Sequence, residues 1–272
     1  MKINKKIFPK RKTESHKGDY GKVFILAGSP GMLGAAILTS RGALRAGAGL
    51  VYLDAPKESR DIINIATPEV IVVSGSQAAI NADALAIGPG LSGRRKAAFD
   101  LLADLSKKKF KKPIILDADG LNAFEGKINA LRNLNLNLIL TPHPGELARL
   151  FQRTLEEILN NREKAARGAA ELFGHVIVLK GHRTVVAGKN GKVYINKTGN
   201  PGMASAGVGD VLTGVIAGLA AQGLNLWDAA CAGVYLHGLA GDLAAAELGE
   251  YGMIASDIID NLPKAIIKAQ KK

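Results

Sequence analysis

The residues from Thr198 to Leu219, TGNPGMASAGVGDVLTGVIAGL, join a glycine-rich loop and one carboxylate to an apolar helical pattern. Gly207 and Gly209 let backbone N–H groups converge, and the N-terminus of the following helix adds a partial positive charge. This arrangement favours an anion, and we expect a phosphate. Asp210 is then suited to take a proton from a hydroxyl group that attacks phosphorus. The alternative is that Asp210 only caps the helix, because aspartate is a favoured N-cap residue.

Polar residues also follow two predicted strands further upstream. The segment DADGLN begins at Asp117, and TPHPGE occupies residues 141–146. Open parallel sheets bind ligands at the carboxyl ends of their strands, so Asp117 and His143 are candidate ligand-binding residues. A capped turn and an incidental histidine are the alternatives. Glu146 either caps or starts the next helix or holds a hydrated magnesium ion.

A third polar segment, Lys180-Gly-His-Arg-Thr184, follows the apolar run 175–180. Lys180 and Arg183 bring two permanent cations to the end of a buried strand. We expect Lys180 to point at nucleotide phosphates, because lysine and arginine make charge-assisted hydrogen bonds with such groups. The alternative is a solvent-facing turn that leads into a hairpin.

The hydrophobic pattern predicts alternating strands and helices. Each expected strand is apolar on both faces, as in parallel sheets covered by helices, so the fold class is α/β with a mostly parallel sheet. Strands are expected at 22–28, 50–55, 69–74, 83–88, 113–117, 136–141 and 175–180, with a hairpin formed by 184–187 and 192–195. Helices are expected to about residue 46 after Gly34, and at 57–65, 94–105, 155–173, 210–222, 227–248 and 255–270. With no linker or repeat, residues 1–272 are expected to form one domain.

Composition narrows the class of protein. The 47% hydrophobic content is ample for a core, and the single cysteine, Cys231, excludes an internal disulfide and a multi-cysteine zinc site. The basic N-terminus lacks the apolar region of a signal peptide, and apolar runs are too short to span a bilayer, so we expect a cytoplasmic protein with no membrane partner. The net charge is +12, but only 5% of residues are aromatic, which leaves few platforms for stacking bases. We therefore expect no nucleic-acid partner.

Two known nucleotide-binding motifs can be compared with the sequence. Gly88-Pro-Gly-Leu-Ser-Gly93 fits the spacing G-x-G-x-x-G after a strand, which is typical of dinucleotide-binding Rossmann folds. However, two or three strands precede it, whereas the Rossmann glycines normally follow the first strand, and Pro89 removes an amide that could face the pyrophosphate. No G-x-x-x-x-G-K-[ST] occurs, which excludes a P-loop NTPase.

The motifs taken together resemble the nucleotide-dependent NAD(P)H-hydrate dehydratase family. The resemblance covers nearly the whole chain and implies a ribokinase-like three-layer α/β/α sandwich. Many relatives carry an N-terminal epimerase domain, whereas the SHKGD motif begins at Ser15 here, so we expect the dehydratase domain alone. The motifs are SHKGDYG (15–21), GAAI (34–37), GAGLV (47–51), GPG (88–90), LDADGLN (116–122), LTPHPGE (140–146), VLKG (178–181), GNPGMA (199–204) and 207–214.

The resemblance also assigns roles to matching positions. It implies that ADP or ATP lies along Lys180, Gly181, His182, Arg183 and Thr184 and against Gly207, Val208 and Gly209, and that the hydrated nicotinamide nucleotide contacts Ala35, Ala36, Gly90, Asp117, His143 and Asp210. Glu146 is expected to act on Mg²⁺ through water. The chain departs from the family pattern G-[ST]-G-D at Val208, where a hydroxyl group is missing, so we expect weaker phosphate contacts.

The implied reaction is dehydration of the S-form of NADHX or NADPHX to NAD(P)H. Asp210 deprotonates the C6 hydroxyl, which attacks the terminal phosphoryl group of ADP or ATP, giving AMP or ADP, and phosphate then leaves. The alternatives are a ribokinase-like kinase of a vitamin precursor, which would release the phosphoester, and a non-enzymatic nucleotide-binding module, which would not need Asp210. Preferences between the nucleotides and between the hydrates stay open. As partners, we expect a homo-oligomer such as a tetramer and a separate NAD(P)HX epimerase.

Overall fold

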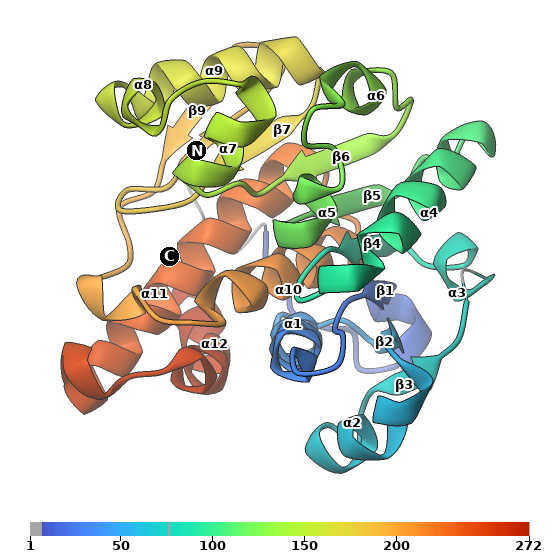
Figure 1. Cartoon of the computed structure of the whole chain (residues 1–272). Helices are drawn as coiled ribbons and strands as arrows, with labels where there is room; N and C mark the ends of the chain where they lie inside the picture. The colour runs from blue at the N-terminus through green and yellow to red at the C-terminus, as the bar shows by residue number, and fades with distance from the viewer. Residues whose placement is uncertain (1–6, 76, 272) are drawn as a thin grey trace.

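A computed structural model describes residues 7–75 and 77–271 and has a central sheet with helices on both faces (Figure 1). The strands run in the order β3-β2-β1-β4-β5-β6-β7-β8-β9. Neighbours from β3 to β7 are parallel, whereas β8 is antiparallel to both β7 and β9. The strands are β1 (Lys22–Leu26), β2 (Leu50–Asp54), β3 (Ile71–Val73), β4 (Ala84–Ile87), β5 (Pro113–Leu116), β6 (Asn137–Leu140), β7 (Val176–Leu179), β8 (Val185–Ala187) and β9 (Val193–Ile195). Every predicted strand is present, and the predicted hairpin is confirmed.

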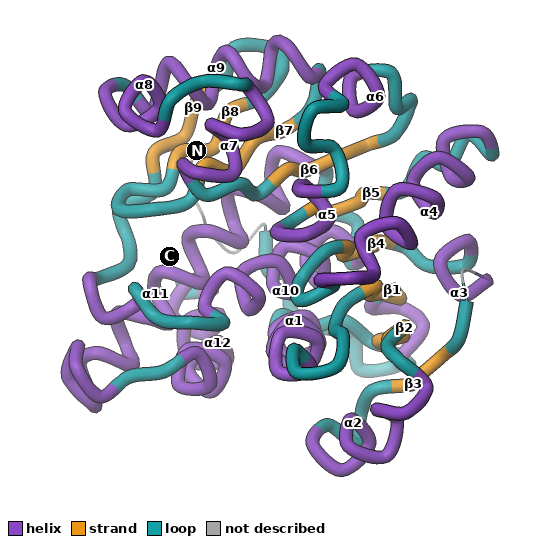
Figure 2. Tube along the Cα trace, viewed as in Figure 1, coloured by secondary structure: helices purple, strands orange, loops and turns teal. Residues whose placement is uncertain are grey.

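The helices alternate with the strands up to β7, and the last three follow the hairpin (Figure 2). They are α1 (Leu33–Arg45), α2 (Arg60–Ala66), α3 (Gln77–Ile80), α4 (Arg95–Lys107), α5 (Ala118–Asn122), α6 (Ile128–Arg132), α7 (Pro144–Phe151), α8 (Leu155–Asn160), α9 (Arg162–Phe173), α10 (Val208–Ala221), α11 (Leu226–Gly252) and α12 (Ala255–Gln270). Short 3-10 helices are η1 (Lys17–Tyr20), η2 (Lys57–Ser59), η3 (Ser92–Arg94) and η4 (Pro201–Met203).

Strands β1 and β4 to β8 are buried on both faces, and their successive side chains point to opposite layers. In β1, Val23 and Ile25 pack with α1, α10, α11 and α12, whereas Phe24 and Leu26 pack with the layer that contains α4 to α9. The predicted α/β class and mostly parallel sheet are therefore confirmed as a three-layer α/β/α sandwich.

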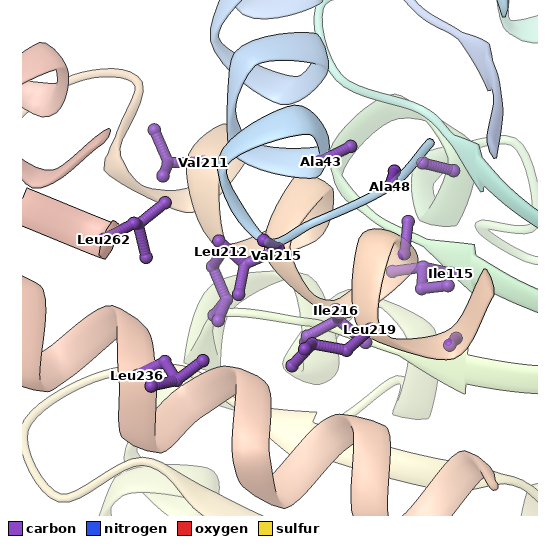
Figure 3. Packing of buried hydrophobic residues seen from close by; sticks show 14 of the residues in the cluster. Ala43, Ala48, Ile115, Val211, Leu212, Val215, Ile216, Leu219, Leu236 and Leu262 are labelled. Carbon is purple, nitrogen blue, oxygen red and sulfur yellow. The ribbon is translucent and has the colours of Figure 1, made fainter. Parts of the chain in front are cut away.

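Helix α10 lies at the centre of one layer and is buried on nearly all sides (Figure 3). Its side chains contact α1, α11, α12 and the sheet; Val215 and Ile216 belong to this core. A Cβ atom at Gly214 would lie 2.0 Å from the carbonyl oxygen of Thr39 in α1, so glycine is required for this close approach. This packing fixes the direction of α10 and thus the position of its N-terminal residues.

Three helix predictions need correction. The segment 155–173 forms two helices, because Asn161 leaves the helical conformation and its side chain accepts from the backbone N–H of Lys164 to cap α9. The segment 57–65 forms η2 followed by α2, and α10 begins at Val208 instead of residue 210. Gly207 is the N-cap of α10, so the hypothesis that Asp210 is the N-cap residue is wrong.

Within residues 7–75 and 77–271, no helix is long and apolar enough to cross a membrane.

Candidate active site

The loops that follow the parallel strands meet at the carboxyl edge of the sheet. Strand β1 lies between β2 and β4, so the order of strands reverses there, and ligands commonly bind at such a point. The loops after β1 and β4 are joined by two hydrogen bonds: Gly28 N donates to Pro89 O at 2.8 Å, and Ser29 Oγ donates to Gly90 O at 2.8 Å.

Three of the predicted substrate-binding residues lie at this junction. Gly90 has φ +63°, and a Cβ atom there would lie 2.9 Å from Cβ of Ala35. Ala35 is half-buried, whereas the side chain of Ala36 is fully buried. Leu38 of the same helix packs against Gly207, which places this group beside the start of α10.

Asp117 and Lys180 form a buried ion pair beside α10. Nζ of Lys180 lies 2.5 Å from Oδ1 of Asp117 and 3.7 Å from Oε2 of Glu146. The second oxygen of Asp117, Oδ2, accepts a hydrogen bond from Thr213 Oγ1 at 2.7 Å. Burial alone would lower the pKa of Lys180, but the charges of Asp117, Glu146 and Asp210 outweigh it and raise that pKa. Lys180 is therefore held as a cation among carboxylates.

Asp210 lies in the first turn of α10. Gly207, the N-cap residue, has φ +84° and no side chain that could accept a hydrogen bond from the first turn. Residue 207 therefore leaves the N–H groups of that turn free of a side-chain cap. Nζ of Lys180 would lie 3.6 Å from a Cβ atom placed on Gly209, which brings this cation next to the same turn. Burial, together with the negative charges of Asp117 and Glu146, raises the pKa of Asp210 to about 7, while Lys180 opposes this rise. A carboxyl group with this pKa can accept a proton near neutral pH.

His143 and Glu146 form a capping box at the start of α7. Nδ1 of His143 accepts from the backbone N–H of Gly145 at 3.0 Å, and Oε2 of Glu146 accepts from the backbone N–H of His143 at 2.7 Å. Glu146 thus caps the helix, as one sequence hypothesis held, while its carboxylate also faces Lys180. The ring of His143 is half exposed at the carboxyl edge.

A cavity of about 490 Å³ opens beside these residues. Its lining includes all of Lys180–Thr184, together with Val208 and Gly209, but not Gly207. The lining also includes residues of the loop 196–205 and of α11. The residues that the sequence assigned to the nucleotide therefore line one cavity, except for Gly207, which is the N-cap of α10.

Arg162 holds the turn at 180–182 through hydrogen bonds to its backbone. Its guanidinium donates to the carbonyl oxygens of Leu179 and Lys180, each at 3.0 Å, and also to that of His182. Burial lowers the pKa of Arg162. The turn is thus held by the protein itself before any ligand binds.

Sequence reasoning missed Thr213, Arg162 and His237. Thr213 lies three residues after Asp210, and this spacing on one helix face is a signal that could have found it. His237 in α11 is buried, lines the cavity, and its Nε2 lies 2.9 Å from the carbonyl oxygen of Val208. Burial and the charge of Lys180 lower the pKa of His237 to about 4, although its bond to Val208 opposes this, so the ring is neutral at pH 7.

A family model described as NAD(P)H-hydrate dehydratase matches residues 23–264 of the chain. The chain belongs to the NAD(P)H-hydrate dehydratase family. An ADP-dependent (S)-NAD(P)H-hydrate dehydratase of Neisseria meningitidis is 39% identical over 93% of this chain and 87% of the relative. A bifunctional NAD(P)H-hydrate repair enzyme of Moorella thermoacetica is 45% identical over 94% of this chain. The chain spans 51% of that relative, about half its length.

Solved structures of two similar proteins share the fold. An ADP/ATP-dependent NAD(P)H-hydrate dehydratase of Bacillus subtilis, co-crystallised with ATP and Mg²⁺, has a TM-score of 0.85 and 33% identity, and the match covers 96% of this chain and 94% of that one. A ribokinase-like superfamily protein of Enterococcus faecalis has a TM-score of 0.84 and 28% identity, with 100% and 98% covered. The predicted ribokinase-like architecture is therefore confirmed.

Val208 has a packing role in this member of the NAD(P)H-hydrate dehydratase family. Its side chain is 8% exposed and belongs to the hydrophobic core around α10, while it also lines the cavity. Where the family pattern has a hydroxyl-bearing side chain, this chain thus has an apolar side chain that packs into the core.

Proposed function

We propose that the protein dehydrates the S-form of NAD(P)H hydrate to NAD(P)H and uses ADP or ATP as the phosphoryl donor. The observation that carries this proposal is the position of Asp210: its pKa is about 7, and it lies in the first turn of α10, next to the cavity that Lys180–Thr184 line. The names of the relatives from Neisseria meningitidis and Bacillus subtilis support the substrate and the nucleotide.

The chain's own residues divide the work. The cavity holds the nucleotide, and the amides at the start of α10 face its terminal phosphates. Ala35, Gly90 and His143 contact the hydrate, while the buried Ala36 supports Ala35. Asp117 holds Lys180 in place, and Lys180 lies beside the phosphates as a fixed positive charge.

Asp210 takes the proton of the C6 hydroxyl, whose oxygen forms a bond to the terminal phosphorus as AMP or ADP leaves. Phosphate is a better leaving group than hydroxide. The ring nitrogen then expels the phosphate from C6, and loss of a proton from the adjacent carbon restores the dihydropyridine.

The carboxylate of Glu146 also fits a magnesium ion brought by the nucleotide. In residues 7–75 and 77–271, no group of three or more histidine, cysteine or acidic side chains could hold a metal. Mg²⁺ is nevertheless commonly bound by one or two carboxylates together with substrate phosphates and water, and Glu146 would supply such an oxygen near Lys180, through a water molecule. When bound, the ion would neutralise charge on the phosphates. The relative co-crystallised with ATP and Mg²⁺ supports this.

The test is to incubate the protein with NADHX, Mg²⁺ and either ADP or ATP, and to follow NADH by its absorbance and AMP, ADP and phosphate by chromatography. We expect one NADH and one phosphate for each nucleotide consumed. A phosphorylated organic product that persists would instead indicate a kinase of the same fold. No nucleotide-dependent formation of NADH would overturn the proposal.

We further propose that residues 1–272 form one domain in the cytoplasm, that the protein is a homo-oligomer, and that it works beside an NAD(P)HX epimerase. The single sheet that receives strands from residues 22–195 supports the first point. The bifunctional repair enzymes among the relatives support the last. Limited proteolysis tests whether the chain is one domain, and cell fractionation tests the compartment. Sedimentation velocity tests the oligomer, and assays with the R-form of NADHX test the need for an epimerase.

A further inference from the structure

Part of the cavity wall is formed by the loop between β9 and α10. Thr198 to Pro201 and Met203 line the cavity together with Lys180–Thr184, and this loop includes η4. Because a loop of this length has several conformations of similar energy, something must hold it in place if it is to form a wall before a ligand arrives.

The carboxylate of Asp242 in α11 binds this loop from behind. Backbone N of Gly199 donates to Oδ1 at 3.1 Å and to Oδ2 at 3.0 Å, and Asn200 Nδ2 donates to Oδ1 at 3.2 Å. The other end of the Asn200 side chain accepts from the backbone N–H of Gly202 at 3.0 Å and caps η4. One carboxylate thus fixes the start of the loop directly and its second half through Asn200.

The loop also packs closely against α11, which restricts the positions that it can adopt. A Cβ atom at Gly238 would lie 2.4 Å from Thr198 Oγ1, and one at Gly241 would lie 2.3 Å from Sδ of Met203. Thr198 Oγ1 also donates to the carbonyl oxygen of Tyr235 at 2.9 Å. Asp242 does not line the cavity, so it acts through the loop and not by touching a ligand.

We propose that Asp242 is a positioning residue that pre-organises the loop 198–203 as a wall of the nucleotide-binding cavity. This inference rests on the proposed function, since it takes a nucleotide as the occupant. If the loop is already ordered, binding of the nucleotide does not have to pay the conformational entropy of ordering it. Replacement of Asp242 should therefore weaken nucleotide affinity.

The experiment compares ADP binding by calorimetry in wild type, Asp242→Asn and Asp242→Ala. Asparagine keeps the shape but loses the charge and one acceptor, so we expect Kd for ADP to rise several-fold, and by about 10-fold or more with alanine. The matched control is Glu247→Gln on the same helix, where an exposed carboxylate lies 2.6 Å from Nζ of Lys264. We expect its Kd to stay within about twofold of wild type.

Turnover separates positioning from a general loss of structure. For Asp242→Asn, we expect KM for the nucleotide to rise while kcat at saturating nucleotide and KM for NADHX stay unchanged. The role of Asp242 would be overturned if kcat fell and both KM values rose by similar factors, or if Kd for ADP did not change. Failure of the wild type to bind ADP would count against the proposed function itself.

Hydrogen exchange of the wild-type protein gives a second test that needs no variant. If Asp242 holds the loop, the N–H of Gly199 is already protected without nucleotide. If the N–H of Gly199 exchanged rapidly without nucleotide and slowly only when ADP was added, the loop would not be pre-organised.

Discussion

The ammonium nitrogen of Lys180 lies 2.5 Å from Oδ1 of Asp117, a carboxylate that is 1% exposed. Thr213 occupies the other oxygen of the same carboxylate, so Asp117 is fully engaged. The sequence predicted a lysine that reaches towards nucleotide phosphates and an aspartate that contacts the substrate. Both remain predictions, but each side chain already has a structural partner, and this changes what their replacement will do.

Lys180→Ala is expected to affect both stability and binding. It leaves Asp117 and Glu146 as buried carboxylates without their cation, which costs about 3–5 kcal/mol in the free energy of unfolding. Loss of the charge should also raise Kd for ADP and ATP by roughly 10- to 150-fold. Urea unfolding and calorimetry measure the two effects.

Lys189→Ala is the control, because Lys189 is an exposed lysine in the hairpin that follows. It should change the free energy of unfolding by no more than about 0.5 kcal/mol. Unchanged nucleotide affinity in Lys180→Ala would refute the placement of the nucleotide along 180–184.

Catalysis should depend on the deprotonated form of Asp210. Because its pKa is about 7, kcat/KM for the hydrate is expected to fall as the pH decreases below 7. Asp210→Asn should lower kcat by about 10²–10⁴-fold and leave ADP binding largely intact. A variant within a factor of roughly three of wild type would rule out Asp210 as the base.

The same pKa has a consequence for stability. The pKa of Asp210 is about 7 in the folded protein against 3.8 as the ordinary value, so the folded state binds the proton more tightly. The resulting stabilisation is complete below pH 3.8 and is lost as the pH rises through 7. At pH 8, Asp210→Asn should therefore be more stable than wild type by roughly 2–4 kcal/mol, with little difference at pH 4. Urea unfolding at both pH values checks this, and an equal difference at the two would contradict it.

The close approach of α1 and α10 makes Gly214 sensitive to substitution. Gly214→Ala places a Cβ atom 2.0 Å from the carbonyl oxygen of Thr39 and must push the helices apart, so we expect a loss of about 2–5 kcal/mol in stability. Gly168 lies in the exposed part of α9, and a Cβ atom there meets nothing within 4 Å. Gly168→Ala should raise stability by about 0.5–1 kcal/mol. Thermal unfolding of both variants measures the contrast, and equal effects would contradict the packing argument.

The sequence allowed every strand to be predicted because the strands are short apolar runs bounded by glycine, proline or charged residues. Helix ends were less predictable. Asn161 divides 155–173 through a side-chain cap that periodicity does not reveal. Helix α10 begins at Val208, two residues earlier than predicted, because Gly207 adopts a positive φ and forms its N-cap.

The site was predictable where residues follow strands, as Asp117, His143 and Lys180 do. Their mutual contacts were not, since the Lys180–Asp117 distance depends on how β5 and β7 are placed on either side of β6. His237 and Asp242 had no local signal, because their partners Val208 and Gly199 lie 29 and 43 residues away in the sequence.

The most direct test of the central claim follows the oxygen of the C6 hydroxyl. NADHX labelled with ¹⁸O at this position is mixed with the enzyme, Mg²⁺ and ADP for a single turnover, and the released phosphate is analysed by mass spectrometry, with the label in unreacted NADHX as the control. If the hydroxyl made basic by Asp210 attacks phosphorus, the phosphate carries one ¹⁸O atom. Unlabelled phosphate, with ¹⁸O released into water while the remaining NADHX keeps its label, would show that the hydroxyl leaves without being phosphorylated and would contradict this mechanism.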